Sequence, residues 1–180
     1  EWVHVRKLLG TDAKEFTQAE IQGRAHVFKI VDFLKHRIPI FKDVELLSIA
    51  AQRGVRETRR FKGLYTLTQE DCTSGARFED GICNVEFNID IHQPDAIDQD
   101  NMETKPYQIP YRCLVPIMTE GLLLAGRCIS GTFEAHGSYR VTSDCMAMGE
   151  AAGAAAYLAI RDNVALRDVN VKELKSIIKI

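Results

Sequence analysis

The sequence has 180 residues, and its 46% hydrophobic content is enough for one domain, or somewhat more, with a buried core. The 23 basic and 25 acidic residues give a net charge of −2, and both signs are spread along the chain, so neither nucleic acid nor an anionic membrane is an expected partner. Five cysteines without a C-x-x-C pair argue against a disulfide framework or a zinc knuckle, so we predict reduced thiols, no metal site and a cytoplasmic location. The longest apolar stretch, Ala151–Ile160, is about half the length that a membrane-spanning helix needs.

The first predicted element is a helix from about residue 18 to residue 37. Thr17 and Glu20 have the spacing of a capping box, in which each side chain hydrogen-bonds the backbone N–H of the other residue. Pro39 should end this helix, because the residue before a proline is disfavoured in the helical conformation. A second, shorter helix is predicted over about residues 43–52.

Extended segments follow. Residues 53–58 and 64–67 are predicted as strands, and Thr68–Asp71 could cap a single helical turn. Residues 85–91 alternate between apolar and polar side chains, which is typical of a half-buried strand. The polar, proline-bounded segment 93–106 is predicted as a loop, with a domain boundary near its end.

The second half begins with two predicted strands, a short one over residues 111–116 and a fully buried one over residues 122–125. A glycine-containing loop and a long helix from about residue 142 to residue 160 come next. A short amphipathic helix is predicted over residues 171–178, with Asn170 as its cap.

The segment that points to chemistry covers residues 121–156 and reads GLLLAGRCISGTFEAHGSYRVTSDCMAMGEAAGAAA. Gly126, at the end of the predicted strand, would let a bulky ligand approach the backbone closely. The following helix would present unpaired N–H groups and a partial positive charge at its start. Its small residues, Gly149 and Gly153 among them, would allow close packing. From the residues alone, this is a strand–loop–helix that could hold a ligand against the backbone.

The same segment resembles the C-terminal flavin-contacting motif of the large FAD-dependent oxidoreductase superfamily that includes glutathione reductase and fumarate reductase. Two further stretches, GVRETRRFKGLYTLTQEDC from Gly54 and IPYRCLVP from Ile109, are similar to the family named FAD-dependent oxidoreductase. The resemblance implies an α/β class, here an α+β fragment that forms the C-terminal part of a two-domain flavoprotein. It further implies that residues 1–106 belong to a substrate or cap domain, and residues 107–180 to the FAD-binding domain.

FAD is the cofactor that the resemblance implies. Gly126 and Arg127 would lie by the ribityl chain, and the helix start would lie beneath the pyrimidine side of the flavin. The cofactor-binding residues implied in this way are Gly126, Arg127, Ser130, Asp144, Cys145, Met146 and Gly149. His136 and Arg140 stand where fumarate-reductase-like relatives carry the histidine and arginine of an H-G-x-N-R loop, and both are candidate catalytic residues.

Two interpretations of the arginine-rich stretch from Arg53 to Lys62 stay open. The cations could form a solvated strand face, or Arg56, with Arg59 and the alternative Arg112, could hold a substrate carboxylate through a planar, bidentate guanidinium. His136 likewise could donate a proton after hydride transfer, or could be an ordinary surface histidine. The implied reaction moves a hydride between a small organic substrate and FAD.

One departure from the superfamily pattern is clear, since the sequence contains no G-x-G and therefore no G-x-G-x-x-G loop for the FAD pyrophosphate. We therefore expect a missing N-terminal FAD-binding segment as a partner, and weak or no FAD binding by these residues alone. Two rival interpretations remain: a structural or assembly module derived from a flavoprotein, and a cysteine-based redox protein that uses Cys145. The sequence leaves a homo-oligomer open.

Overall fold

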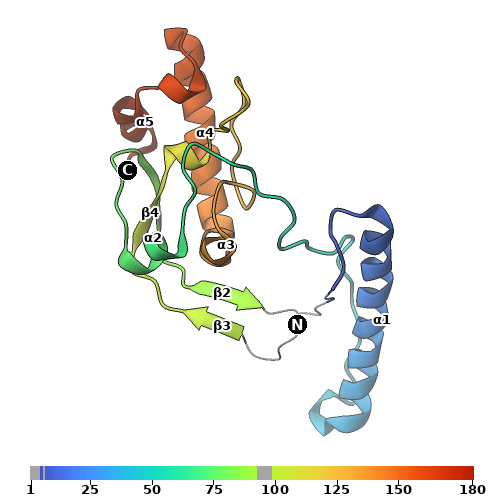
Figure 1. Cartoon of the computed structure of the whole chain (residues 1–180). Coiled ribbons are helices and arrows are strands. Elements are labelled where there is room, and N and C mark those ends of the chain that lie inside the picture. Colours follow the sequence, from blue (N-terminus) through green and yellow to red (C-terminus); the bar gives the residue numbers. More distant parts are fainter. Residues whose placement is uncertain (1–4, 6, 93–98) are drawn as a thin grey trace. The chain divides into compact units, whose positions relative to one another are not determined.

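The computed structural model describes residue 5 and residues 7–92 and 99–180. The chain forms two compact units, Glu1–Thr58 and Arg59–Ile180. The first unit contains helix α1 (Ala13–Arg37) and a short 3-10 helix (Pro39–Phe41). Among the described residues, the strands and the remaining helices lie in the second unit. They are α2 (Gln69–Ser74), β1 (Gly81–Val85), β2 (Ile89–His92), β3 (Gln99–Met102), β4 (Tyr107–Pro110), a 3-10 turn (Tyr111–Cys113), α3 (Phe133–Tyr139), α4 (Thr142–Asp162), a 3-10 turn (Leu166–Asp168) and α5 (Val171–Ile178) (Figure 1).

Helix α1 begins one turn earlier than the sequence suggested. Asp12 is the N-cap, and its carboxylate accepts a 2.8 Å hydrogen bond from the N–H of Glu15. The predicted capping box is therefore wrong: Thr17 donates within the helix to the carbonyl of Ala13, and Glu20 pairs with Arg24 at 2.8 Å. The helix ends at Arg37, before Ile38 and the proline, as predicted. The second predicted helix, over residues 43–52, is absent, and this segment is irregular.

The strands form two antiparallel pairs, and both lie in the second unit. β1 pairs with β4, with Val85 opposite Tyr107, and β2 pairs with β3, with Ile89 opposite Met102. The alternating segment 85–91 is therefore no single strand, because it breaks at residues 86–88 and contributes to both pairs. Part of the predicted loop 93–106 forms β3, while residues 93–98 lie outside the described residues.

Several other predicted strands are corrected. Residues 111–116 begin as a 3-10 turn, because the strand ends at Pro110. Residues 122–125 form no strand, and Leu122 is 44% exposed. The N–H of Leu124 donates to the carbonyl of Leu114, but this hydrogen bond does not extend into a ladder. Residues 53–58 are irregular, and Leu67 forms only an isolated bridge with Gly131. In each case the segment has suitable side chains, but no strand within the described part of the chain lies beside it to complete a ladder.

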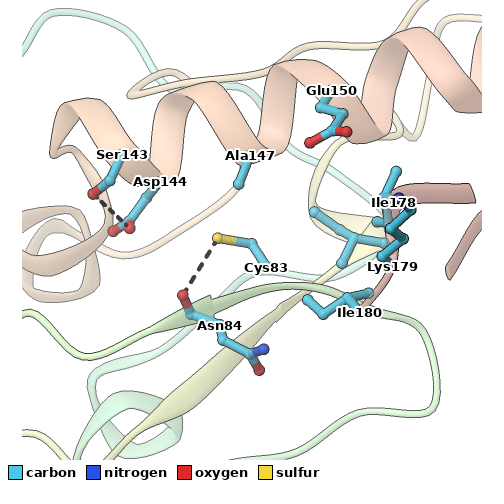
Figure 2. Close-up of a pocket in the computed structure, with 10 residues that line it drawn as sticks. Cys83, Asn84, Ser143, Asp144, Ala147, Glu150, Ile178, Lys179 and Ile180 are labelled. Carbon is cyan, nitrogen blue, oxygen red and sulfur yellow. Dashed lines mark hydrogen bonds between the residues drawn. The ribbon is translucent and has the colours of Figure 1, made fainter.

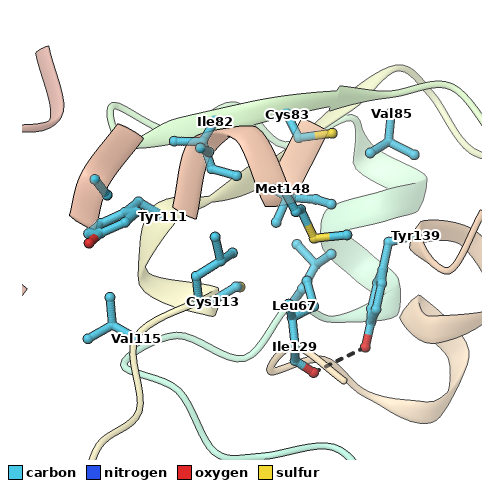
Figure 3. Close-up of a cluster of buried hydrophobic side chains, with 14 of the residues drawn as sticks. Leu67, Ile82, Cys83, Val85, Tyr111, Cys113, Val115, Ile129, Tyr139 and Met148 are labelled. Atoms are coloured by element: carbon cyan, nitrogen blue, oxygen red, sulfur yellow. Dashed lines mark hydrogen bonds between the residues drawn. The ribbon is translucent and has the colours of Figure 1, made fainter. Parts of the chain in front are cut away.

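The core of the second unit lies between α4 and the β1–β4 pair. Met148, Ala151, Ala155 and Leu158 recur on the buried side of α4 at helical spacing. Figure 3 shows Ile82 and Val85 of β1 near Met148, with the phenol of Tyr139 reaching the carbonyl of Ile129. α5 packs beside α4 and β1, and Asn170 caps it as predicted.

The described chain is thus a mixture of helices and small antiparallel strand pairs, which agrees with the α/β class in its coarse form. The two units separate between Thr58 and Arg59, and β1 pairs with β4 across residue 106. The assignment of residues 1–106 to a cap domain and residues 107–180 to an FAD domain stays a prediction. Among the described residues, no helix combines the length and apolar character required to cross a bilayer.

Candidate functional site

The start of α4 is the centre of the candidate site. Val141 is its N-cap, and no side chain of the described residues caps the helix there. The first N–H groups of a helix have no partner within the helix, and together with the helix dipole they favour negative charge or an electron-rich oxygen. With 21 residues, α4 is long enough for its dipole to matter at this end.

Gly126 lies against this helix start. Its φ is +92°, a backbone conformation that residues other than glycine rarely adopt. A Cβ built on Gly126 would lie 3.8 Å from the sulfur of Cys145. The neighbouring Arg127 is exposed. Gly126 and Arg127 therefore lie near Cys145, although twenty residues or so separate them in sequence.

Cys145 is half-buried, and its thiol donates to the carbonyl of Arg140 at 3.6 Å. Burial raises the pKa of this thiol, and the Asp144 carboxylate adds to the effect. A redox or nucleophilic cysteine needs a low pKa, so these surroundings do not support the cysteine-based interpretation. All five cysteines are free thiols.

Three other residues implied for cofactor binding lie in different surroundings. Ser130 is fully buried and shares a 3.0 Å hydrogen bond with Thr66, so its hydroxyl holds two loop segments together. Met146 is 70% exposed, and Gly149 faces open space on α4. Met146 and Gly149 therefore share the exposed side of the helix, whereas Ser130 belongs to the interior.

His136 does not lie in a loop, because residues 133–139 form helix α3 with Thr132 as its N-cap. The imidazole is 1% exposed, and its ring meets that of Tyr139 edge to face at 5.6 Å. The expectation of a loop histidine at the surface is corrected: the side chain lies inside the unit. Its catalytic role stays a prediction.

Arg140, at the C-terminal end of α3, is held by Asp90 of β2. One terminal nitrogen donates to the carbonyl of Asp90 at 2.8 Å and to its carboxylate at 2.9 Å. This pair is largely buried and joins α3 to β2. Arg140 therefore anchors the loop from which α4 starts.

The two remaining candidate arginines belong to different units. Arg112 makes a bidentate contact with Asp80, at 2.9 and 3.1 Å, and its guanidinium lies 5.1 Å from the ring centre of Tyr65. The Asp80 carboxylate raises the pKa of Arg112 further, so this group stays charged. Arg56 lies in the first unit. A carboxylate clamp built from these arginines stays a prediction.

A pocket that the sequence did not predict lies beside the start of α4 (Figure 2). It has a volume of about 350 Å³ and is lined by three segments far apart in sequence, namely Ile82–Asn84 of β1, Ile178–Ile180 at the end of α5, and Ser143, Asp144, Ala147 and Glu150 of α4. Only Asp144 had been singled out from the sequence. The other members come together through the packing of α4 and α5 on β1, for which the sequence holds no local signal.

Asp144 is 7% exposed, and burial raises the pKa of its carboxyl to about 6. Ser143 lies 3.3 Å from Oδ1 and opposes part of this effect. Within the part of the chain that the structure describes, Oδ2 is buried and has no hydrogen-bond partner. A buried carboxylate oxygen without a donor is costly.

The chain as a whole can be compared with known proteins. The model of one protein family, described as FAD dependent oxidoreductase, matches residues 2–178, which is nearly the whole chain. No curated protein matches the sequence, and no solved structure does.

Proposed function

The chain belongs to the FAD dependent oxidoreductase family, and from this premise we propose that the start of α4, with Gly126, forms the wall against which the flavin ring lies. The family match indicates FAD dependence and a flavin-linked redox function. We further propose that the reaction is a hydride transfer between the flavin and a small organic substrate that carries a carboxylate.

One observation carries the proposal: α4 has no side-chain cap, and Gly126 lies against its first turn. The N–H groups of Thr142 and Ser143 can donate to an electron-rich ring oxygen, and the positive end of the helix dipole favours negative charge on the reduced ring. The glycine leaves room beside the helix for a flat ring. The backbone thus supplies the hydrogen-bond donors, at the start of α4, and the space for the ring, at Gly126.

Bound FAD would supply the redox chemistry, and the protein would supply orientation and electrostatics. Arg127 is exposed beside Gly126 and could bind an anionic group of the cofactor or substrate. Arg140 would act as a positioning residue, because its contact with Asp90 fixes the loop that leads into α4. The residues present fit the ring end of the cofactor, whereas the sequence offers no G-x-G loop for the pyrophosphate end.

A ring-only probe tests this assignment without the pyrophosphate. Lumiflavin would be titrated into the ¹⁵N-labelled chain, and the amide shifts would be followed by NMR. We expect the largest shifts at Gly126, Arg127 and residues 142–145, with little change at the opposite end of α4 near Tyr157. Shifts confined to other segments, or none at all, would remove the proposal.

A pair of glycine variants gives the control. Gly126→Val places a side chain where the ring should lie and should abolish the lumiflavin shifts. Gly153→Ala should leave the lumiflavin shifts intact, because Gly153 lies on the exposed side of α4 and a Cβ there meets nothing within 4 Å. Equal lumiflavin binding by both variants would contradict a ring site at Gly126.

A further inference from the structure

The pocket between β1, α4 and the end of α5 has a charged group inside it. Asp144 and Ala147 lie on the side of α4 that faces β1, and the carboxylate of Asp144 is directed toward the Cys83 segment (Figure 2). The Asp144 side chain lines this pocket, whereas the sulfur of Cys145, the next residue, lies near Gly126. The first turn of α4 therefore contributes one residue to this pocket and the next to the surroundings of Gly126.

The unsatisfied oxygen defines what the pocket would bind. Oδ2 of Asp144 is buried, and no donor reaches it among the described residues. A carboxylate in this position gains most from a ligand that brings both a positive charge and N–H donors, because charge-assisted hydrogen bonds are the strongest available to it. The Cys83 thiol cannot replace such a ligand, since it is a weak donor and its sulfur is directed to the carbonyl of Asn84 at 3.8 Å.

The rest of the lining limits the ligand to a small molecule with a short apolar part. Ile82 is buried, while Ala147 and Ile178 are half-buried, and together they provide an apolar wall. Glu150 and Lys179 are exposed, charged side chains at the pocket. The volume of about 350 Å³ is at the small end of the range for ligand sites.

We propose that this pocket binds a small primary alkylammonium ion, whose charged group contacts Asp144 and whose alkyl chain lies along Ile82, Ala147 and Ile178. The ammonium supplies three donors for the Asp144 carboxylate, which lines the pocket. Glu150 adds negative charge at the opening, and Lys179 partly offsets it. The pocket lining does not include Gly126 or Arg127, so the shifts at those two residues distinguish the flavin wall from this site.

The direct test compares n-butylammonium with n-butanol, which has a similar shape but no charge, by NMR titration of the 180-residue chain at pH 7.5. We expect n-butylammonium to shift the amides of residues 82–84, 144 and 178, and n-butanol to bind about tenfold more weakly or worse, because it lacks the charge-assisted bond. Equal binding of the two compounds would overturn the proposal, since it would show a merely apolar pocket. Absence of n-butylammonium binding would overturn it as well.

Asp144→Asn is the matching variant, because it keeps the size of the side chain and removes its charge. It should weaken n-butylammonium binding about tenfold or more while leaving the far-ultraviolet spectrum of the protein unchanged. Glu150→Gln, at the exposed edge, should weaken it less, because an exposed charge is screened by solvent. An Asp144→Asn protein that binds n-butylammonium as tightly as the wild type would overturn the assignment.

A measurement on the unaltered protein covers the case in which the variant fails to fold. The pKa of Asp144, about 6 in the free protein, can be followed through the ¹³C shift of its carboxyl carbon. Saturating n-butylammonium should lower this pKa, because a bound cation favours the ionised carboxylate, and the other charges at the pocket, Glu150 and Lys179, are unchanged. An unchanged pKa at saturation would show that the ammonium binds elsewhere.

Discussion

Arg140 donates from one terminal nitrogen to both the carboxylate and the main-chain carbonyl of Asp90, at 2.9 and 2.8 Å. The contact spans fifty residues and joins the end of α3 to β2. Since α4 starts immediately afterwards, this pair helps to fix the direction in which α4 leaves the loop.

Replacement of Arg140 by Ala should destabilise the second unit by about 2–3 kcal/mol, because it removes a charge-assisted contact with the largely buried Asp90 carboxylate. The free energy of unfolding in urea measures the effect. Arg161→Ala is the matched control, because Arg161 pairs with Asp162 and Glu173 at the surface and its loss should have a smaller effect. Equal losses in the two variants would show that the Asp90 pair has no special structural role.

Thr68→Ala should cost about 1 kcal/mol, because Thr68 is the N-cap of α2 and forms a reciprocal capping box with Asp71. Thr17→Ala should change stability little or raise it, since Thr17 lies inside α1 and alanine is the better helix former. Urea unfolding of both variants distinguishes the two positions. A larger loss at Thr17 would mean that α1 begins where the sequence pattern suggested, and not at Ala13.

Asp144 should make the protein less stable as the pH rises from about 4 to about 6. Its folded-state pKa is raised from 3.8 to about 6 by burial, so folding favours the protonated form, and this advantage is lost as the carboxyl ionises. The difference corresponds to at most about 3 kcal/mol. Urea unfolding at several pH values should show a smaller loss over this range in Asp144→Asn than in the wild type.

The control for this pH dependence is Glu150→Gln, which alters an exposed carboxylate on the same helix. It should keep the wild-type dependence between pH 4 and 6. If Asp144→Asn and the wild type lost stability in parallel, the carboxyl of Asp144 would have to ionise as easily in the folded protein as in the unfolded chain.

Cys145 should react slowly with iodoacetamide at neutral pH. Burial and the neighbouring Asp144 carboxylate raise the pKa of its thiol, so little of the reactive thiolate is present. Mass spectrometry after timed alkylation gives the rate for each of the five cysteines, with a short peptide containing one cysteine as the reference. Alkylation of Cys145 faster than that of the peptide would restore the cysteine-based interpretation.

The ends of several helices could be predicted from the sequence, because they depend on residues a few positions apart. Asn170 predicted the start of α5, and the Thr68–Asp71 spacing predicted the cap of α2. The long helix from residue 142 was confirmed as α4. The capping box at Thr17 was wrong because Asp12 offers a cap one turn earlier, and the sequence pattern cannot rank two local alternatives of this kind.

Strand pairing and the pocket were decided by tertiary structure. The apolar residues 122–125 have the composition of a buried strand, yet none of the strands that the structure describes pairs with them, whereas Gln99–Met102 forms β3 because β2 lies beside it. In the same way, the sequence marked Asp144 as part of a helix start but not the direction of its side chain, which follows from the packing of α4 on β1. Helix caps depend on neighbours in sequence, while ladders, burial and pockets depend on neighbours in space, and only the folded chain brings Asp144, Cys83 and Ile178 together.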